Sequence, residues 1–413
     1  MTPSARLQAA IEILEALAHS NKPADRFIRD WFRARRYAGA KDRAGVGERV
    51  FAVLRRRASL AWRVRDESPR ALVMASLAEE GCNVGELFDG SKYGPPPLSD
   101  EERAALAHPR VDTPPLWVQG EFPEFLEEEL KKSLGTNLLE EMRAMSGRAT
   151  IDLRANMLKA ARDDVLGELR GDGFAAEPVP YARHGIRIRE HTGAAALSRT
   201  RAFLDGRFEF QDEAAQIASL LCAAKPGERI LDLAAGAGGK ALALAAQMDN
   251  RGLIVARDRD PARLAQLGPR AARAGVTMIR DAAPEEDTFD AVFVDAPCSG
   301  SGAWRRQPEQ KWRLTPERVR ELQAIQDQLL DEAAEATRGR IVYATCSLFA
   351  CENEDRVAAF LARHPDFRLA LAAEIWRDAT GSAPPPGMAE IFRATPRTTG
   401  TDGFFTAVLT RRA

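Results

Sequence analysis

The sequence predicts an α/β protein whose C-terminal half forms a mostly parallel sheet with helices on both faces. From about residue 203 onward, short apolar patterns typical of buried strands alternate with longer amphipathic patterns typical of helices, and the connections between them are short. Strand–helix units repeated in this way form sheets of this kind. The 413 residues are enough for two or three domains, so the first half of the chain is expected to fold separately.

The first part of the chain predicts an all-helical module. Leu7, Ile11, Leu14 and Leu17 recur at helical spacing in the first predicted helix. The helical patterns of this module are at 5–18, 24–37, 43–57 and 69–80. Prolines and glycines then interrupt the pattern, which predicts a connection with at most one short helix, near 99–107. We therefore assign residues 1–115 to one helical module with its linker.

A small α+β module is predicted next, over residues 116–202. The pattern is helical at 117–146 and again at 161–171. Polar and apolar residues alternate at 150–154 and 185–189, as in half-buried strands. Three arginines on these strands are compatible with a nucleic-acid role: Arg154, Arg187 and Arg189.

The remaining residues, 203–413, are expected to form the sheet domain. Helices are predicted at 213–224, 239–248, 261–274, 315–338 and 352–363. Strands are predicted at 229–233, 252–257, 276–280, 290–294, 340–344 and 404–410. In an open parallel sheet, ligands bind beyond the carboxyl ends of the strands. Residues at those ends are therefore the candidates for a functional site.

Composition restricts where the protein works. Hydrophobic residues make up 45% of the chain and charged residues 29%, which is typical of a globular protein in water. No apolar run reaches the roughly 18–20 residues that cross a bilayer, and the N-terminus lacks the apolar core of a signal peptide. The five cysteines are scattered, without the spacing of a disulfide framework or a structural zinc site. We expect a cytoplasmic protein with free thiols, no metal and no membrane partner.

Charge is distributed unevenly along the first half of the chain. Residues 1–70 contain 16 basic and 8 acidic residues, whereas residues 71–141 contain 5 basic and 15 acidic ones. A basic N-terminal module can neutralise nucleic-acid phosphates, although a solvated helix surface explains the charge equally well.

The turn after the first strand of the sheet is rich in small residues. It reads Ala234-Ala-Gly-Ala-Gly-Gly-Lys240, so a ligand can approach the backbone and the start of the next helix. Its spacing is neither that of a dinucleotide turn nor that of a phosphate loop. Asp258 and Asp281 end the next two strands, where they can bind a ribose and an adenine amino group or, alternatively, cap helices. An adenosine ligand without a pyrophosphate suits this arrangement, and S-adenosylmethionine fits the description.

Two cysteines follow strand patterns at the same edge of the predicted sheet. Cys298 lies in Asp295-Ala-Pro-Cys-Ser-Gly-Ser-Gly302, and Cys346 lies in Ala344-Thr-Cys-Ser347. A free cysteine is most often a small buried hydrophobe. Two thiols at one edge, with an aspartate beside the first, indicate covalent chemistry instead.

These two cysteine motifs closely resemble those of the Sun/Fmu-type, RsmB-like RNA 5-methylcytosine methyltransferases, and the likeness covers nearly the whole chain. Further stretches that resemble this family are at 153–156, 206–213, 305–312 and 400–405. The N-terminal helices are similar to the NusB-like module that many members carry. The glycine turn departs from the family pattern, because Ala237 stands in place of a proline and Ala241 in place of a threonine.

The resemblance implies the rest of the architecture and the roles of individual residues. It implies a Rossmann-like class I methyltransferase domain with a mostly parallel seven-stranded sheet, preceded by an RRM-like module and the NusB-like one. The residues implied to line the S-adenosylmethionine site are Ala234, Ala235, Gly236, Ala237, Gly238, Gly239, Lys240, Asp258, Asp281 and Asp295. The implied nucleophile is Cys346.

The chemistry of cytosine methylation gives each candidate residue a step. Cytosine C5 is a poor nucleophile, so a thiolate must first add to C6 of the ring. We expect Cys346 to add, Asp295 to stabilise or protonate N3, and Cys298 to assist release of the product. The target base must be unstacked, which is easiest in single-stranded or loop RNA. Arg305 and Lys311 are the local cations expected to contact RNA phosphates.

Other functions remain compatible with parts of this pattern. A DNA cytosine methyltransferase would use the cysteine of the Pro-Cys motif, Cys298, as its nucleophile. A non-catalytic RNA-binding or ribosome-assembly factor would need only the basic modules, and a dinucleotide oxidoreductase would need a longer glycine pattern. Family analogy favours small-subunit ribosomal RNA as the substrate, with transfer RNA as the alternative. A monomer is favoured, although the sequence does not set the oligomeric state.

Overall fold

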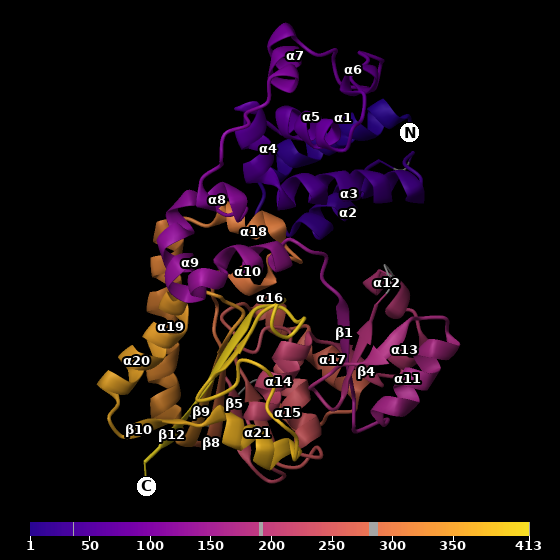
Figure 1. The fold of residues 1–413 in the computed structure, drawn as a ribbon. Coiled ribbons are helices and arrows are strands. Elements are labelled where there is room, and N and C mark those ends of the chain that lie inside the picture. The colour runs from indigo at the N-terminus through magenta and orange to yellow at the C-terminus, as the bar shows by residue number, and fades with distance from the viewer. Residues whose placement is uncertain (36, 190–192, 281–287, 413) are drawn as a thin grey trace. The chain divides into compact units, whose positions relative to one another are not determined.

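The computed structural model describes residues 1–35, 37–189, 193–280 and 288–412, and the chain divides into two compact units (Figure 1). The first unit contains residues 1–147 together with 304–314, and the second contains residues 148–303 together with 315–413. Every described helix is too short or too polar to cross a membrane.

The boundary between the helical and mixed parts lies later in the chain than the predicted division between residues 115 and 116. Residues 116–147 belong to the first unit. Glu121 gives the physical reason, because its carboxylate accepts hydrogen bonds from the backbone N–H groups of Ala58 and Ser59, at 2.9 and 3.2 Å. These two residues begin a helix of the first unit, so the acidic side chain ties residues 116–147 to it.

The first unit is helical throughout its described elements. Its α-helices are α1 (Pro3–Ala18), α2 (Ala24–Arg33), α3 (Ala40–Arg55), α4 (Arg57–Val64), α5 (Pro69–Glu79), α6 (Val84–Leu87), α7 (Asp100–Ala107), α8 (Leu116–Gln119), α9 (Glu127–Leu134), α10 (Leu138–Met145) and α18 (Pro308–Arg313). Short 3₁₀ helices precede α9 and α10, at Glu124–Leu126 and Gly135–Asn137. Apolar faces of α1, α3 and α5 form its core, which includes Ile13, Val50 and Val73.

Helix α18 is a distant part of the chain that folds with this first unit. The Glu309 carboxylate accepts a hydrogen bond from the backbone N–H of Ala24 at 2.9 Å, at the start of α2. The Trp312 Nε1–H donates to the carbonyl of Leu54 at 2.9 Å, near the end of α3. The residues that follow the Cys298 motif in sequence therefore leave the second unit and return to it at α19 (Pro316–Ala336).

The second unit begins with a four-stranded antiparallel sheet, ordered β2-β3-β1-β4. Its elements are β1 (Ile151–Ala155), α11 (Arg162–Gly171), β2 (Ala176–Pro178), β3 (Gly185–Ile188), α12 (Ala194–Leu197), α13 (Arg201–Leu204) and β4 (Phe208–Phe210). Strands and helices follow one another as in a ferredoxin-like β-α-β-β-α-β unit, so the predicted α+β module is present. Arg187, one of its strand arginines, forms an ion pair with the buried Asp152 at 2.7 Å.

A large sheet fills the rest of the second unit. Its strands are β5 (Arg229–Asp232), β6 (Leu253–Ala256), β7 (Ile279–Arg280), β8 (Phe289–Asp295), β9 (Thr337–Thr345), β10 (Phe367–Ala370), β11 (Phe392–Ala394) and β12 (Phe404–Arg411). Its further helices are α14 (Glu213–Leu221), α15 (Gly239–Gln247), α16 (Pro261–Leu264), α17 (Leu267–Ala274), α20 (Glu354–Arg363) and α21 (Ala372–Thr380), with 3₁₀ helices at Ser301–Ala303 and Ala350–Glu352.

Over the residues that the structure describes, this sheet has eight strands and mixed direction, whereas seven mostly parallel strands were expected. The order is β10-β12-β9-β8-β5-β6-β7, and β11 also pairs with β12. Strands β5 to β9 are parallel to one another, but β12 runs antiparallel to β9, β10 and β11. Figure 1 shows α14, α15 and α21 on one face and α19 and α20 on the other. Both faces are apolar, which explains the continuous apolar runs of the central strands.

Candidate active site

The carboxyl ends of four neighbouring strands meet at one pocket. Its volume is about 510 Å³. Strand β5 leads to Ala234, β6 to Asp258, β8 to Asp295 and Cys298, and β9 to Cys346. The other lining residues are Leu233, Arg259, Asp260, Arg263, Ala296, Pro297, Arg318, Ile325 and Leu329. The structure thus brings both cysteines and two of the predicted acids to one cavity.

The glycine turn, residues 234–239, is held by Asp258. Gly236 and Gly238 have φ angles of +55° and +81°, which residues with side chains rarely adopt. The Asp258 carboxylate accepts a hydrogen bond from the backbone N–H of Gly236 at 2.7 Å and another from that of Asp260 at 2.8 Å. A side chain at Gly238 would collide with Leu267, since its Cβ would lie 2.1 Å from Leu267 Cδ1. Asp258 therefore shapes the turn as well as lining the pocket.

Lys240 and Asp295 form an ion pair beneath the pocket. The Lys240 Nζ donates a hydrogen bond to Asp295 Oδ2, and the lysine side chain is largely buried. Asp232, at the end of β5, is fully buried nearby, and burial together with the Asp295 carboxylate raises its pKa to about 7. Lys240 partly offsets that shift. The lysine implied to line the cofactor site thus holds the Asp295 carboxylate in position.

The two thiols lie in contact. Cys298 Sγ is 3.4 Å from Cys346 Sγ, and both sulfurs belong to partly exposed residues of the pocket. The hydrogen bond to Cys346 and burial hold the pKa of Cys298 well above its usual value, and the negative charges of Cys346 and Glu352 act in the same direction. A thiol that keeps its proton can donate a hydrogen bond to a neighbouring sulfur but is a poor nucleophile.

A buried glutamate joins the two cysteine loops. The Glu352 carboxylate accepts hydrogen bonds from the hydroxyls of Ser299 and Ser347, and from the backbone N–H of Ser299 at 2.8 Å. Burial raises the pKa of Glu352. Sequence reasoning missed this group, although its signal was present: both motifs read Cys-Ser, and the two serines meet at one acid. The contact fixes the separation of Cys298 and Cys346.

An arginine from α17 holds the glycine turn from the other side. Arg270 donates to the carbonyl of Ala237 at 2.6 Å and to the Glu209 carboxylate at 2.8 Å. Glu209 belongs to β4 of the small sheet, is only 3% exposed and also binds Arg273. No local sequence pattern encodes this contact, because Glu209, Ala237 and Arg270 are separated from one another by 28 residues or more. The small sheet therefore supports the glycine turn of the large one.

Two predicted RNA contacts are not on the surface. Lys311 is 3% exposed and Arg305 is 5% exposed. The Lys311 Nζ lies 3.4 Å from the carbonyl of Arg55, and burial lowers its pKa to about 8 even though Glu121 opposes the shift. The expectation that these cations contact phosphates is corrected accordingly, because Lys311 in α18 and Arg305 in the segment before α18 are both buried. Asp281, the predicted adenine contact, lies outside the described residues.

Two family models match the chain. Residues 219–410 match the model described as 16S rRNA methyltransferase RsmB/F. Residues 122–194 match the model described as the ferredoxin-like domain of RsmF/B-like methyltransferases, which agrees with the small antiparallel sheet.

Relatives under both family names are equally similar. The chain is 31% identical over 264 residues to the probable ribosomal RNA small subunit methyltransferase B of Bacillus subtilis, covering 61% of the chain and 58% of that protein. It is 32% identical over 277 residues to the ribosomal RNA small subunit methyltransferase F of Cronobacter sakazakii, covering 63% and 57%. The match thus spans less than two thirds of either relative. The crystal structure of PH0851 is 26% identical, with a TM-score of 0.75 over 99% of both chains.

Proposed function

The chain belongs to the 16S rRNA methyltransferase RsmB/F family, and from this premise we propose that it methylates C5 of a cytosine in RNA, with S-adenosylmethionine as the methyl donor and Cys346 as the nucleophile. The observation that carries the proposal is the pair of thiols 3.4 Å apart in the pocket that Asp258 and Asp295 also line. The proposed substrate is ribosomal RNA of the small subunit. Neither the B nor the F type of relative is favoured by identity.

The pocket fits S-adenosylmethionine in size and chemistry. Its volume of about 510 Å³ lies within the range of small-molecule sites, about 300–1,000 Å³. The glycine turn would hold the cofactor against the backbone, and Asp258 would accept hydrogen bonds from the ribose hydroxyls. Bound there, the cofactor supplies an electrophilic methyl group.

Each side chain then has a defined task. The Cys346 thiolate forms a bond to C6 of cytosine, and the electron pair of the C5=C6 bond shifts into the ring toward N3. Asp295, held by Lys240, stabilises or protonates N3 as that charge develops. After C5 is methylated, its proton leaves, the C5=C6 bond re-forms and the Cys346–C6 bond breaks. We assign Cys298 to assist this elimination, because its sulfur is in contact with that of Cys346.

Asp258→Ala is expected to weaken S-adenosylmethionine binding by about 1.5–3 kcal/mol, the scale of charge-assisted hydrogen bonds. The variant loses the ribose acceptor and also the hydrogen bond that Asp258 accepts from Gly236. Isothermal calorimetry measures the affinity, with Asp258→Asn as the partner variant that keeps one acceptor oxygen. If Asp258→Ala bound S-adenosylmethionine with unchanged affinity, Asp258 would not be a cofactor contact.

Arg270→Ala is expected to raise the KM for S-adenosylmethionine roughly tenfold, the effect of losing one charge-assisted hydrogen bond to the glycine turn. Turnover at saturating cofactor should change little, since Arg270 holds the turn through Ala237 and does not line the pocket. Arg273→Ala is the matched control, because Arg273 also binds Glu209 but donates its other hydrogen bond to the carbonyl of Phe203 instead of to the turn. Equal effects of the two substitutions would refute a positioning role for Arg270.

Labelled S-adenosylmethionine tests the proposed function directly. The protein is incubated with small-subunit ribosomal RNA, transfer RNA or DNA, and the modified position is mapped by bisulfite sequencing. We expect label in ribosomal RNA at a cytosine that resists bisulfite conversion. Label in DNA alone would indicate a DNA methyltransferase. Label in transfer RNA would mean that transfer RNA, and not ribosomal RNA, is the substrate. RNA binding without any label would indicate a non-catalytic assembly factor.

A further inference from the structure

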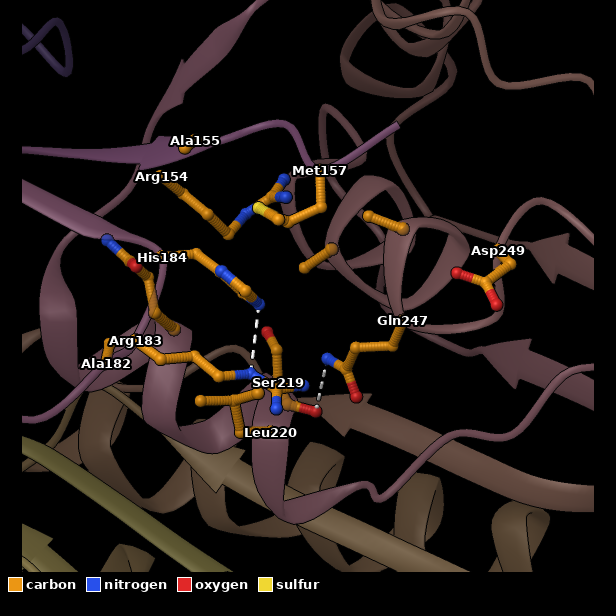
Figure 2. A pocket seen from close by; sticks show the side chains of 13 residues that line it. Arg154, Ala155, Met157, Ala182, Arg183, His184, Ser219, Leu220, Gln247 and Asp249 are labelled. Carbon is orange, nitrogen blue, oxygen red and sulfur yellow. Dashed lines mark hydrogen bonds between the residues drawn. The ribbon is translucent and has the colours of Figure 1, made fainter. Parts of the chain in front are cut away.

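A second cavity, of about 230 Å³, lies in the second unit between the small sheet and helices α14 and α15 (Figure 2). Arg154 of β1 and the loop residues Arg183 and His184 line one side, and Leu220 of α14 and Gln247 of α15 line the other. None of the described residues lines both this cavity and the active-site pocket. The cavity is therefore a separate site, and no step of the proposed reaction uses it.

The positive charge of Arg154 at this cavity is only partly compensated. The side chain is 6% exposed, and its Nε donates to the neutral Gln211 at 2.6 Å. Glu209 lies opposite Arg154 in the strand pair, but its carboxylate is already bound by Arg270 and Arg273. Burial lowers the pKa of Arg154 to about 10 despite the attraction of Glu209. A buried guanidinium in this situation gains from an additional anion.

The pKa of His184 is lowered by burial and by the same positive charges. Burial lowers the pKa of His184 to about 4, and the charges of Arg183, Arg154 and Arg162 lower it further in the same direction. The Arg183 Nε donates to His184 Nε2 at 3.0 Å, as the dashed line in Figure 2 shows. Since Nε2 accepts this bond, the proton of the neutral ring is on Nδ1, which makes Nδ1–H a second kind of donor beside the guanidinium groups.

Asp249, the one acid among the described residues that line the cavity, does not cancel this charge. Figure 2 shows Asp249 across the cavity from Arg154 and His184. Asp249 is exposed and pairs with Arg251 at 3.3 Å. Leu220, Ala243 and Ala246 contribute apolar surface to the cavity, and Gln247 adds a neutral amide. Donors on one wall and apolar surface on the other match a sugar–phosphate unit, in which charge and carbon surface alternate.

We propose that this cavity binds a phosphodiester group of the RNA substrate, with Arg154 and Arg183 facing the phosphate and the apolar wall facing a ribose. The proposal rests on the RNA substrate inferred above. It gives the small sheet a task at a distance from the reacting base: to hold the RNA backbone while the target cytosine is in the active site. Phosphate contacts of this kind set the register of a nucleic acid without reading its sequence.

Arg183→Ala is the principal test, because Arg183 is exposed and its loss should leave the fold intact. Affinity for a small-subunit ribosomal RNA fragment is measured by fluorescence anisotropy over a range of salt concentrations. We expect the Kd to rise about tenfold and the salt slope to fall by about one unit, as for the loss of one phosphate contact. S-adenosylmethionine affinity and turnover at saturating RNA should stay at wild-type values.

Arg201→Ala is the matched control. Arg201 lies on α13 of the same module, is exposed, pairs with Asp205 at 2.7 Å and does not line the cavity. The substitution removes the same charge, so it should change the salt slope much less than Arg183→Ala does. Equal slopes for the two variants would overturn the proposal, because the effect would then be that of net charge alone.

NMR of histidine-labelled protein gives an independent readout. An anion beside His184 should raise the pKa of the ring from about 4 toward its usual value. The RNA fragment is expected to produce this change in the wild type and not in Arg183→Ala. A change with inorganic phosphate but none with RNA would identify a site for a free anion and overturn the RNA assignment, as would no change with either.

Methylation assays on the same preparations separate this inference from the proposed function. If the wild type methylates RNA and Arg183→Ala binds RNA with unaltered affinity, the proposed phosphate site is refuted and the proposed function stands. Weakened RNA binding in Arg183→Ala without methylation by the wild type would support the site and refute the function.

Discussion

Cys346→Ala is expected to abolish methyl transfer while S-adenosylmethionine binding stays near that of the wild type. Without this thiolate nothing adds to C6, so C5 never becomes nucleophilic enough to take the methyl group. Cys346 lies at the carboxyl end of β9, whereas the cofactor contacts proposed here come from the glycine turn and Asp258, on other strands. Turnover is measured with labelled cofactor and binding by calorimetry.

Cys82→Ala serves as the control for Cys346→Ala. Cys82 is an exposed cysteine of the first unit and does not line the active-site pocket, so its loss should leave turnover unchanged. If Cys346→Ala kept more than roughly a few per cent of wild-type turnover, covalent activation by this thiol would be ruled out.

Cys298→Ala is expected to fail later in the reaction, by trapping the protein on its RNA. The variant keeps Cys346, so attack and methylation should still occur. Removing the neighbouring sulfur, 3.4 Å away, should slow the elimination that frees the enzyme. The trapped species should survive denaturing gel electrophoresis as a protein–RNA adduct. The double variant should form no adduct, because release cannot matter before attachment.

One outcome of these two experiments would reverse the roles that we assign to the cysteines. An adduct in Cys346→Ala that is missing in Cys298→Ala would make Cys298 the nucleophile. The chemistry would then resemble that expected of a DNA cytosine methyltransferase. The two sulfurs are 3.4 Å apart, so either could reach the same ring carbon, and the position of the adduct distinguishes the two assignments.

The central strands were predictable because burial on both faces leaves a local signature. Strands β5 and β8 coincide closely with the apolar runs predicted at 229–233 and 290–294. Edge strands carry no such signature. The three-residue strands Ala176–Pro178 and Phe392–Ala394 contain a proline or an arginine, and only pairing with β3 and β12 makes them strands. The mixed direction of the large sheet depends on the tertiary pairing of β12 with β9, β10 and β11 and was missed.

The residues of the candidate site also include some that could be predicted from the sequence and some that could not. Strand-end residues such as Asp258 and Cys346 were predictable, because the carboxyl ends of parallel strands share one edge. Contacts between distant segments, such as that of Glu352 with Ser299, were not, since no local pattern encodes them. Lys311 shows the opposite error. A lysine near a catalytic motif is usually exposed, but the chain carries this one into the first unit, where it is buried.

Identification of the attached cysteine in a trapped complex tests the central claim most directly. RNA containing 5-fluorocytosine is suitable, because fluorine replaces the C5 proton that must leave, so the adduct persists after methyl transfer. Trypsin separates the two thiols, since Cys298 lies in the fragment 281–305 and Cys346 in the fragment 341–356. Mass spectrometry is expected to find the methylated, fluorinated nucleotide on Cys346. A nucleotide on Cys298, or no adduct from RNA that the protein otherwise methylates, would contradict the account.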